Sequence, residues 1–267
     1  MFPLSAEDRE VTALEAQSYE KILPHANTAI LYIHGILGTP LHFRDFFPLA
    51  DHCSQYSILL AGHGGEARDF SRASMGIWKQ QVHSKVLELL DTHRDLLIVA
   101  HSMGTLFAIS EALAFPDRVK GLFLLAAPLK VAVRPVLAVN CWKVFWGTVS
   151  PGDSVALAAQ RAYGIRQDFR IWRYLGWAPR YIELFREIRR VRSQLCHLTV
   201  PVIAYQSSLD EMVSPKAVRL LQAVPSAQVE VLNHATHFYY DPQELTSILN
   251  RFSEFVQPVP VEGGIFL

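Results

Sequence analysis

The amino-acid sequence predicts an α/β protein in which a mostly parallel central sheet is flanked by helices and contains one helical insertion. Two observations lead to this prediction. Short apolar runs alternate with longer amphipathic segments along most of the chain, and the alternation stops between residues 128 and 196. A repeating strand–helix–strand order is typical of a parallel sheet with helices on both faces. Half of the 267 residues are hydrophobic, so the chain can bury a large core.

The predicted strands are short apolar runs bounded by turn residues, as buried parallel strands usually are. They lie at residues 29–33, 56–60, 96–100, 121–126, 202–205 and 229–232. The predicted helices lie at residues 77–90, 103–115, 179–195, 215–223 and 242–255. The last two begin with proline, whose missing N–H leaves no hydrogen bond unmade in the first turn of a helix.

Residues 128–196 form the predicted insertion. They divide the chain into a core of residues 1–127 and 197–267 and a helical cap. The insertion contains no convincing strand and is rich in aromatic residues. It interrupts the alternation between two consecutive strands of the predicted parallel sheet. Because parallel strands end at one edge of their sheet, we expect the cap to lie over that edge.

The composition excludes several classes of protein. Lys and Arg together number 25, as do Asp and Glu, so net charge provides no attraction to nucleic acid or to an anionic membrane. No apolar run approaches the roughly 20 residues that span a bilayer, and the first residues do not resemble a secretory signal. The three cysteines, Cys53, Cys141 and Cys196, lack metal-site spacing and indicate free thiols. We expect a cytoplasmic monomer or homodimer without stable membrane insertion.

Ser102 is the candidate nucleophile, because it joins a predicted strand directly to a predicted helix. Small residues, Ala100 and Gly104, lie two positions before and after it. This spacing matches the G-x-S-x-G nucleophile elbow, with Ala in place of the first Gly. The elbow needs small residues because larger ones would clash in the strained turn. A serine that only caps the helix is the alternative interpretation.

A glycine-rich loop at residues 34–38, His-Gly-Ile-Leu-Gly, follows the first predicted strand. Ligands of open α/β sheets bind at this position, where strands end. Acyl transfer needs two N–H donors for the oxyanion of its tetrahedral intermediate, and we assign the backbone N–H groups of Ile36 and Met103. Taken alone, the loop is better explained as an ordinary turn between a strand and a helix, and it is the elbow at Ser102 that favours the oxyanion hole.

Asp210 and His237 are the candidate acid and base. Each follows a predicted strand, so that the order along the chain is Ser, Asp, His. In such a triad a neutral His accepts the serine proton, and the carboxylate orients the imidazole. Glu211 and His234 are the alternatives to these two residues.

With these motifs, the sequence resembles the carboxylesterase and monoacylglycerol-lipase branch of the α/β-hydrolases over roughly residues 28–255. The matching segments are 34–38, 59–64 (Leu-Leu-Ala-Gly-His-Gly), Trp78, 101–104 (His-Ser-Met-Gly), 210–215 (Asp-Glu-Met-Val-Ser-Pro), and His237 with Asp241. The resemblance implies the α/β-hydrolase fold with a cap over the active site, no metal and no organic cofactor. It favours Asp210 over Glu211. The chain departs from the family at Ala235 and Thr236, where Ser-Gly is usual before the histidine.

The sequence therefore predicts hydrolysis of small-molecule carboxylic esters through an acyl-enzyme, with short- to medium-chain acyl esters or monoacylglycerols as substrates. We expect Trp142, Trp146 and Trp177 of the cap to line an apolar acyl cleft, although ordinary packing would explain each equally well. Thioesters and carbon–carbon bonds next to a carbonyl are alternative substrates of the same triad. A receptor that binds ligands without catalysis is the alternative from another class, and it typically lacks an intact triad.

Overall fold

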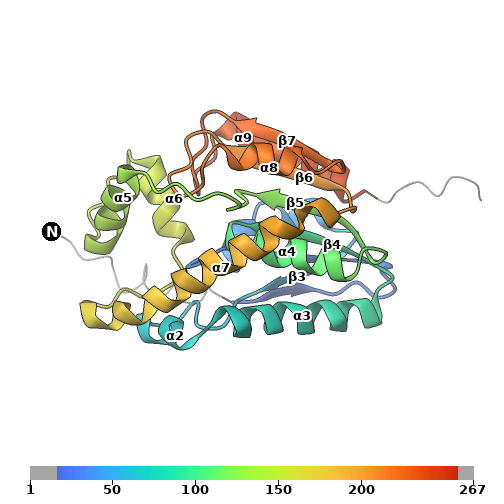
Figure 1. The fold of residues 1–267 in the computed structure, drawn as a ribbon, viewed down its shortest axis with the longest axis horizontal. Helices are drawn as coiled ribbons and strands as arrows, with labels where there is room; N and C mark the ends of the chain where they lie inside the picture. The colour runs from blue at the N-terminus through green and yellow to red at the C-terminus, as the bar shows by residue number, and fades with distance from the viewer. Residues whose placement is uncertain (1–16, 258–267) are drawn as a thin grey trace, which may run out of the picture.

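Seven strands form one sheet in the computed structural model, which describes residues 17–257 (Figure 1). In spatial order they are β1 (Tyr19–Lys21), β3 (Ser54–Ile58), β2 (Thr28–Ile33), β4 (Asp95–His101), β5 (Val119–Leu125), β6 (Val202–Ser207) and β7 (Ala227–Leu232). β1 pairs antiparallel with β3, and all other neighbours are parallel. The sequence-based prediction of a mostly parallel sheet is confirmed.

The six predicted strands are all present, with one notable shift at β3. Its predicted range was 56–60, but the strand begins at the polar residues Ser54 and Gln55. Gln55 is fully buried because its amide group is satisfied: it accepts the Tyr32 hydroxyl proton and donates to two backbone carbonyls. Hydropathy alone therefore excluded two residues that hydrogen bonds hold inside the sheet.

Helices cover both faces of the sheet, and the side chains of its central strands alternate between the faces, as the two-residue period of a strand requires. Ile98 and Ala100 point into one core cluster, whereas Leu97 and Val99 point into the other. The first cluster packs under α3 (Met75–Thr92), α4 (Met103–Ala114), α7 (Ala178–Gln194) and α8 (Ala217–Gln222). The second packs under η1 (Pro40–Phe43), η2 (Phe47–Ala50) and α9 (Pro242–Phe255).

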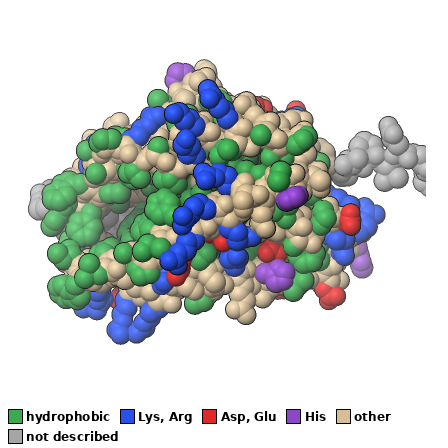
Figure 2. Space-filling model, in the orientation of Figure 1, with side chains coloured by type: hydrophobic (Ala, Val, Ile, Leu, Met, Phe, Trp, Pro, Cys, Tyr) green, Lys and Arg blue, Asp and Glu red, His purple; other side chains and the backbone are tan. Residues whose placement is uncertain are grey.

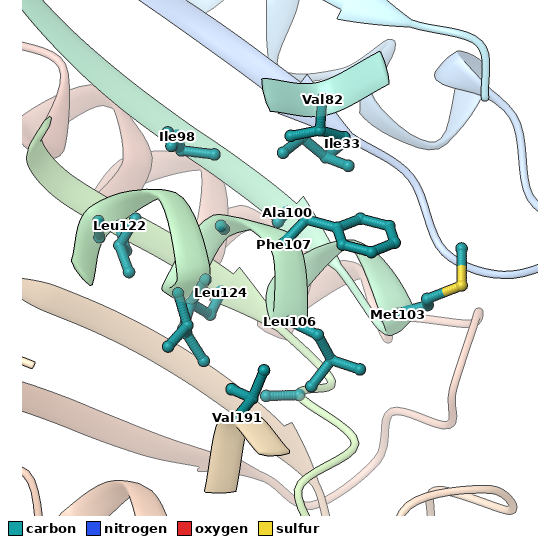
Figure 3. Close-up of a cluster of buried hydrophobic side chains, with 14 of the residues drawn as sticks. Ile33, Val82, Ile98, Ala100, Met103, Leu106, Phe107, Leu122, Leu124 and Val191 are labelled. Atoms are coloured by element: carbon teal, nitrogen blue, oxygen red, sulfur yellow. The ribbon is translucent and has the colours of Figure 1, made fainter. Parts of the chain in front are cut away.

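Figure 3 shows the first cluster around α4, the helix that follows the candidate nucleophile. Leu106 and Phe107 of this helix lie over Ala100 of β4 and Leu124 of β5, and Val191 of α7 closes the cluster from outside. All five side chains are almost completely buried. Because close-packed interiors resist deformation, this packing fixes the start of α4 against the sheet.

The chain between β5 and β6 contains α5 (Pro135–Trp146), α6 (Ser154–Ala162), η3 (Ile171–Trp177), α7 and η4 (Leu195–His197). In Figure 1, α5 and α6 lie at one end of the molecule, beyond the sheet, whereas α7 crosses over α4. α7 buries Leu184, Ile188 and Val191 in the first core cluster. Within residues 17–257, no helix is both long and apolar enough to cross a membrane.

Two short pairings connect this inserted segment to loops of the core. Residues 130–134 run beside residues 211–214 through alternating backbone hydrogen bonds, including Val131 paired with Val213. The N–H of Gly164 donates to the Leu37 carbonyl at 2.6 Å, and the N–H of Gly64 donates to the Gly164 carbonyl at 2.6 Å. The prediction about the first residues of the chain falls on residues 1–16, which lie outside the described part, as do residues 258–267.

Candidate active site

Ser102 lies in a strained turn between β4 and α4. Its backbone has φ +50° and ψ −124°, outside the regions that residues other than glycine readily adopt. A Cβ at Gly104 would lie only 2.2 Å from the Ile33 carbonyl oxygen, and one at Gly35 would lie 2.8 Å from the Ser102 Cβ. Glycine is therefore required at both positions by close packing around the serine.

The structure brings Ser102, His237 and Asp210 together from three loops that follow β4, β7 and β6. Ser102 Oγ lies 3.0 Å from His237 Nε2, and His237 Nδ1 lies 2.8 Å from Asp210 Oδ2. All three side chains are buried. With the proton on Nδ1, the imidazole donates to the carboxylate and accepts from the serine hydroxyl, which is the geometry of general-base activation.

The two neighbouring carboxylates have different positions. Asp210 Oδ1 accepts the N–H groups of Met212 and Val213 at 2.8 and 2.7 Å, so its carboxylate is held while Oδ2 faces His237. Glu211 Oε2 instead accepts the backbone N–H of His237 at 3.0 Å. The sequence indicated Glu211 only as an alternative to Asp210. Its contact with the backbone of His237 was not predicted.

His234, the alternative base, is exposed, and its backbone N–H is bound by Glu244. Asp241, which figured in the family resemblance, accepts the N–H of Gln243 at the start of α9. It therefore caps a helix in this structure. His237 alone of the two histidines has a ring within hydrogen-bonding distance of Ser102.

Burial and negative charge act in opposite directions on His237. Burial lowers the pKa of its imidazole, but the charge of Asp210, the hydrogen bond to Asp210 and the charge of Glu211 together outweigh it, so the pKa is raised. The ring also packs against His101, at a centroid distance of 4.9 Å, and against Phe238, at 4.7 Å. Its orientation is thus fixed on several sides.

The tilted rings of His101 and His42 lie in contact beside His237, an arrangement that sequence patterns did not indicate. Their ring centroids are 3.9 Å apart, and His101 Nε2 lies 3.0 Å from the backbone carbonyl of His237, to which it can donate. Burial, followed by the charges of nearby histidines, lowers the pKa of His101 well below its usual value and that of His42 to about 3. Both rings are therefore neutral at pH 7, adding no positive charge beside the base.

The loop 34–38 lies against Ser102. No hydrogen-bond partner for the N–H of Ile36 or of Met103 is found among residues 17–257. Met103 is the first residue of α4, where backbone N–H groups have no partner within the helix. A turn closes the loop, with Leu37 at φ +58° and the Gly38 N–H donating to the Gly35 carbonyl.

Two neutral histidines connect this loop to residues 59–64. His63 Nε2 accepts the N–H of Leu37 at 3.1 Å, and His34 Nε2 accepts the N–H of Leu60 at 3.0 Å. Accepting at Nε2 places the proton on Nδ1 of each ring. Burial lowers the pKa of His34 to about 4 and that of His63 well below its usual value, which maintains these acceptors at neutral pH.

The three tryptophans proposed to line an acyl cleft lie in different environments. Trp142 and Trp146 on α5 are exposed, with ring centroids 5.5 Å apart. Trp177 is buried against Phe70, and its indole N–H donates to the Ala67 carbonyl at 2.9 Å. The packing of Trp177 is explained by these contacts, and the contact of any of the three with substrate stays a prediction.

A surface cavity of about 360 Å³ lies apart from the Ser102 relay. It is lined by Glu66 and residues 166–170, and four of these six residues are charged. Such a lining does not fit an alkyl chain. Among the described residues, no cluster of three or more His, Cys, Asp or Glu side chains could hold a metal ion.

Comparison with solved structures gives full-length similarities at low sequence identity. A structure of the metagenome-derived lipolytic enzymes LipS and LipT is 18% identical with a TM-score of 0.69, and the match covers 91% of this chain and 97% of that one. Paleococcus ferrophilus monoacylglycerol lipase is 18% identical with a TM-score of 0.64, covering 90% and 98%. A haloalkane dehalogenase variant from Bradyrhizobium elkanii is 15% identical with a TM-score of 0.56, covering 90% and 91%.

At these identities the similarities establish the fold, which lipolytic enzymes share with a dehalogenase of different chemistry. No curated protein sequence matches the chain. The Alpha/beta hydrolase family matches residues 30–246, which include Ser102, Asp210 and His237. The chain belongs to the alpha/beta hydrolase family.

Proposed function

We propose that the chain is a serine hydrolase that cleaves carboxylic esters through an acyl-enzyme intermediate, with Ser102 as nucleophile, His237 as base and Asp210 as the acid that orients the base. The observation that supports this most directly is the continuous relay from Ser102 Oγ through His237 to Asp210, with distances of 3.0 and 2.8 Å. A structural serine at a helix start would not need strained backbone or a buried imidazole–carboxylate pair beside it.

Each step of the reaction has a group available for it. His237 Nε2 takes the proton as Ser102 Oγ attacks the ester carbonyl, and the resulting imidazolium is stabilised by Asp210. The N–H groups of Ile36 and Met103 would then stabilise the oxyanion of the tetrahedral intermediate. His237 returns the proton to the leaving alcohol, and a water molecule hydrolyses the acyl-enzyme with the same base.

The proposed oxyanion hole favours a carbonyl substrate. Displacement of a halide by the Ser102 hydroxyl would leave a stable ether on the enzyme, whereas attack on a carbonyl gives an acyl-enzyme that water can hydrolyse, with the two N–H groups stabilising the oxyanion. Thioesters and ketones are also carbonyl compounds, and they stay as alternative substrates. We further propose that residues 128–196 act as a cap which determines the acyl-chain length, with short- to medium-chain esters or monoacylglycerols as substrates.

Labelling with a fluorophosphonate probe, followed by a panel of p-nitrophenyl esters, monoacylglycerols and acyl thioesters, tests the proposal. Ser102→Ala is expected to abolish labelling and to reduce kcat by on the order of 10⁶, the size of a triad knockout in another serine hydrolase. His237→Ala is expected to reduce kcat similarly. His234→Ala is the matched control from the same loop and should retain most activity.

Two results would contradict the proposal. Absence of labelling in the folded wild-type protein would favour the non-catalytic receptor. Retention of a tenth of wild-type turnover by Ser102→Ala would exclude Ser102 as nucleophile. Higher kcat/KM for thioesters than for matched oxygen esters would change the substrate class while leaving the residue assignments unaltered.

A further inference from the structure

The net charge of zero conceals a strong asymmetry between the inserted segment and the rest of the chain. Residues 128–196 contain 12 of the 25 Lys and Arg residues but only four of the 25 Asp and Glu residues. The insertion therefore has a formal charge of +8, and the remainder has −8. Seven of these 12 basic residues form no ion pair with a described residue.

The same segment exposes most of the large hydrophobic side chains on the described surface, 11 of 16. We define the cap patch as ten of these residues: Val136, Val139, Trp142, Trp146, Phe169, Ile171, Trp172, Leu175, Ile182 and Phe185. Patches of this kind on soluble proteins usually bind a partner or a membrane.

Tryptophan makes the patch unusual. Of the five tryptophans in the chain, Trp78 and Trp177 are buried, and the three exposed ones, Trp142, Trp146 and Trp172, are all in the patch. Their exposed fractions are 65%, 43% and 64%. The Trp146 ring lies 5.5 Å from that of Trp142 and 6.1 Å from that of Phe169, so aromatic surface continues from α5 towards η3.

Basic side chains adjoin this hydrophobic surface. On α7, the exposed residues Ile182, Phe185, Arg186 and Arg189 are three or four positions apart, which places them on one face of the helix. Figure 2 shows hydrophobic side chains gathered at the end of the molecule where α5 and the start of α7 lie, and a band of Lys and Arg side chains beside them on the same face.

We propose that the cap patch attaches the protein to the surface of an anionic lipid bilayer. Exposed tryptophans flanked by arginines are typical of interfacial attachment, because indole rings favour the headgroup region and basic groups are attracted to anionic headgroups. The negative remainder of the molecule would be repelled by the same surface, which orients the cap towards it. The chain would lie on the bilayer with the cap patch in the headgroup region.

A second copy of the chain is a weaker candidate for the partner that binds the cap patch. A symmetric interface would bring together two surfaces that each have excess positive charge, and like charges oppose each other across an interface. An anionic bilayer satisfies the hydrophobic and the basic parts of the surface together. The net charge of the whole chain gives no sign of this attraction because it averages over two oppositely charged parts.

Tryptophan fluorescence can test the attachment, since all three exposed tryptophans are in the patch. Vesicles of phosphatidylglycerol are expected to shift the emission to shorter wavelength, and bromine-labelled acyl chains are expected to quench it. Vesicles of phosphatidylcholine should cause little change, and salt should reverse the binding. Ser102→Ala should bind like the wild type, so this test is independent of the proposed catalytic function.

Matched variants locate the binding surface in vesicle sedimentation. Arg186→Gln with Arg189→Gln is expected to reduce the partition coefficient by roughly tenfold or more, because each basic residue near an anionic surface adds about fivefold. Trp142→Ala with Trp172→Ala should reduce it by a similar factor. The controls are Lys216→Gln with Arg219→Gln, and Ile22→Ala with Leu87→Ala, which are exposed outside the patch.

Three results would overturn the proposal. The first is no binding to phosphatidylglycerol vesicles by the folded wild-type protein. The second is an equal loss of binding in the control variants and the patch variants. The third is a concentration-dependent blue shift without lipid, together with dimers in sedimentation velocity that Trp142→Ala with Trp172→Ala abolishes. That last result would assign the patch to contacts between copies.

Discussion

At the scale of single residues, the protonation of His237 connects the geometry of the site to a measurable pH profile. In the proposed reaction only the neutral imidazole can take the proton of Ser102, so activity should fall as pH drops through the pKa of His237. Because the charges of Asp210 and Glu211 raise this pKa, the acid limb of kcat/KM should have its midpoint above the ordinary value of about 6.5.

Asp210→Asn tests the origin of that shift. Removing the charge should move the acid limb to lower pH and, since the imidazole loses its orienting partner, should reduce kcat by on the order of 10⁴. Glu211→Gln retains an oxygen that can accept the His237 N–H, so it should move the limb less and change kcat little. A larger shift in Glu211→Gln than in Asp210→Asn would reverse the assignment of the two acids.

The sequence predicted the proximity of the candidate residues but not the contacts that support them. Ser102, Asp210 and His237 follow strands, and parallel strands end at one edge, so their proximity could be predicted. The contacts of Glu211, His101 and His42 around His237 could not, because they join loops distant in sequence. His101, for instance, meets the carbonyl of His237 136 positions later, and no local pattern encodes that contact.

At the scale of elements, the strap formed by Tyr163 to Arg166 connects the inserted segment to the candidate oxyanion loop. Gly164 donates to the Leu37 carbonyl and accepts from the Gly64 N–H, both at 2.6 Å, and Arg166 donates to the Gly65 carbonyl at 2.8 Å. The position of Leu37 determines how its neighbour Ile36 presents its N–H. The strap therefore offers a physical route by which the inserted segment can position the proposed oxyanion hole.

Gly164→Ala tests this positioning role. A Cβ there would lie 2.3 Å from Thr39 Cγ2 and 2.7 Å from the Gly38 carbonyl oxygen, so the strap and the loop would have to separate. Displacing an oxyanion donor is expected to reduce kcat up to about 100-fold, since outright removal of one costs about 10²–10³. Affinity for a trifluoromethyl ketone should fall with kcat, while affinity for the product acid should change little.

Gly152→Ala is the control for that substitution. Gly152 is also in the inserted segment, but a Cβ there would have no atom within 4 Å, so activity and thermal stability should stay at the wild-type level. If Gly164→Ala reduced the affinities for the product acid and for the ketone equally, the strap would have only a structural role. Unaltered kcat in Gly164→Ala would also rule out the positioning role.

Element types were predictable where hydrophobic patterns were long, and less so where pairing partners define the element. The predicted helix 242–255 coincides with α9, because proline and a capping Asp241 mark its start. β1 was not predicted. Its three residues, Tyr-Glu-Lys, have no apolar run, and their strand conformation depends on antiparallel pairing with β3. The strap at Gly164 likewise has no local sequence signature.

At the scale of the whole molecule, four histidines with lowered pKa values couple folding to pH. Burial is the main cause that lowers the pKa values of His34, His42, His63 and His101. The unfolded chain therefore binds protons that the folded chain does not, below about pH 6.5. Their contribution to stability is present above that pH and is lost as pH falls towards the folded values. His237, whose pKa is raised, has the opposite effect, lost as pH rises through its folded pKa.

His42→Phe isolates one member of this group. The pKa of His42 is lowered to about 3, first by burial and then by the charges of His237 and His34, and its buried Nε2 has no hydrogen-bond partner among the described residues. Phenylalanine retains the aromatic contact with His101 and breaks no hydrogen bond, so stability at pH 7 should be equal or higher. Between pH 7 and pH 5, where the wild type is destabilised, the loss in unfolding free energy should be smaller in the variant by about 2 kcal/mol.

Urea unfolding at both pH values measures this difference, and His197→Gln is the matched control at an exposed histidine. The control should lose as much stability as the wild type between pH 7 and pH 5. Identical losses in His42→Phe and the wild type would mean that His42 is protonated as readily in the folded chain as in the unfolded one. The acid sensitivity would then have to come from His34, His63 and His101, whose rings accept or donate hydrogen bonds that couple the loops around Ser102.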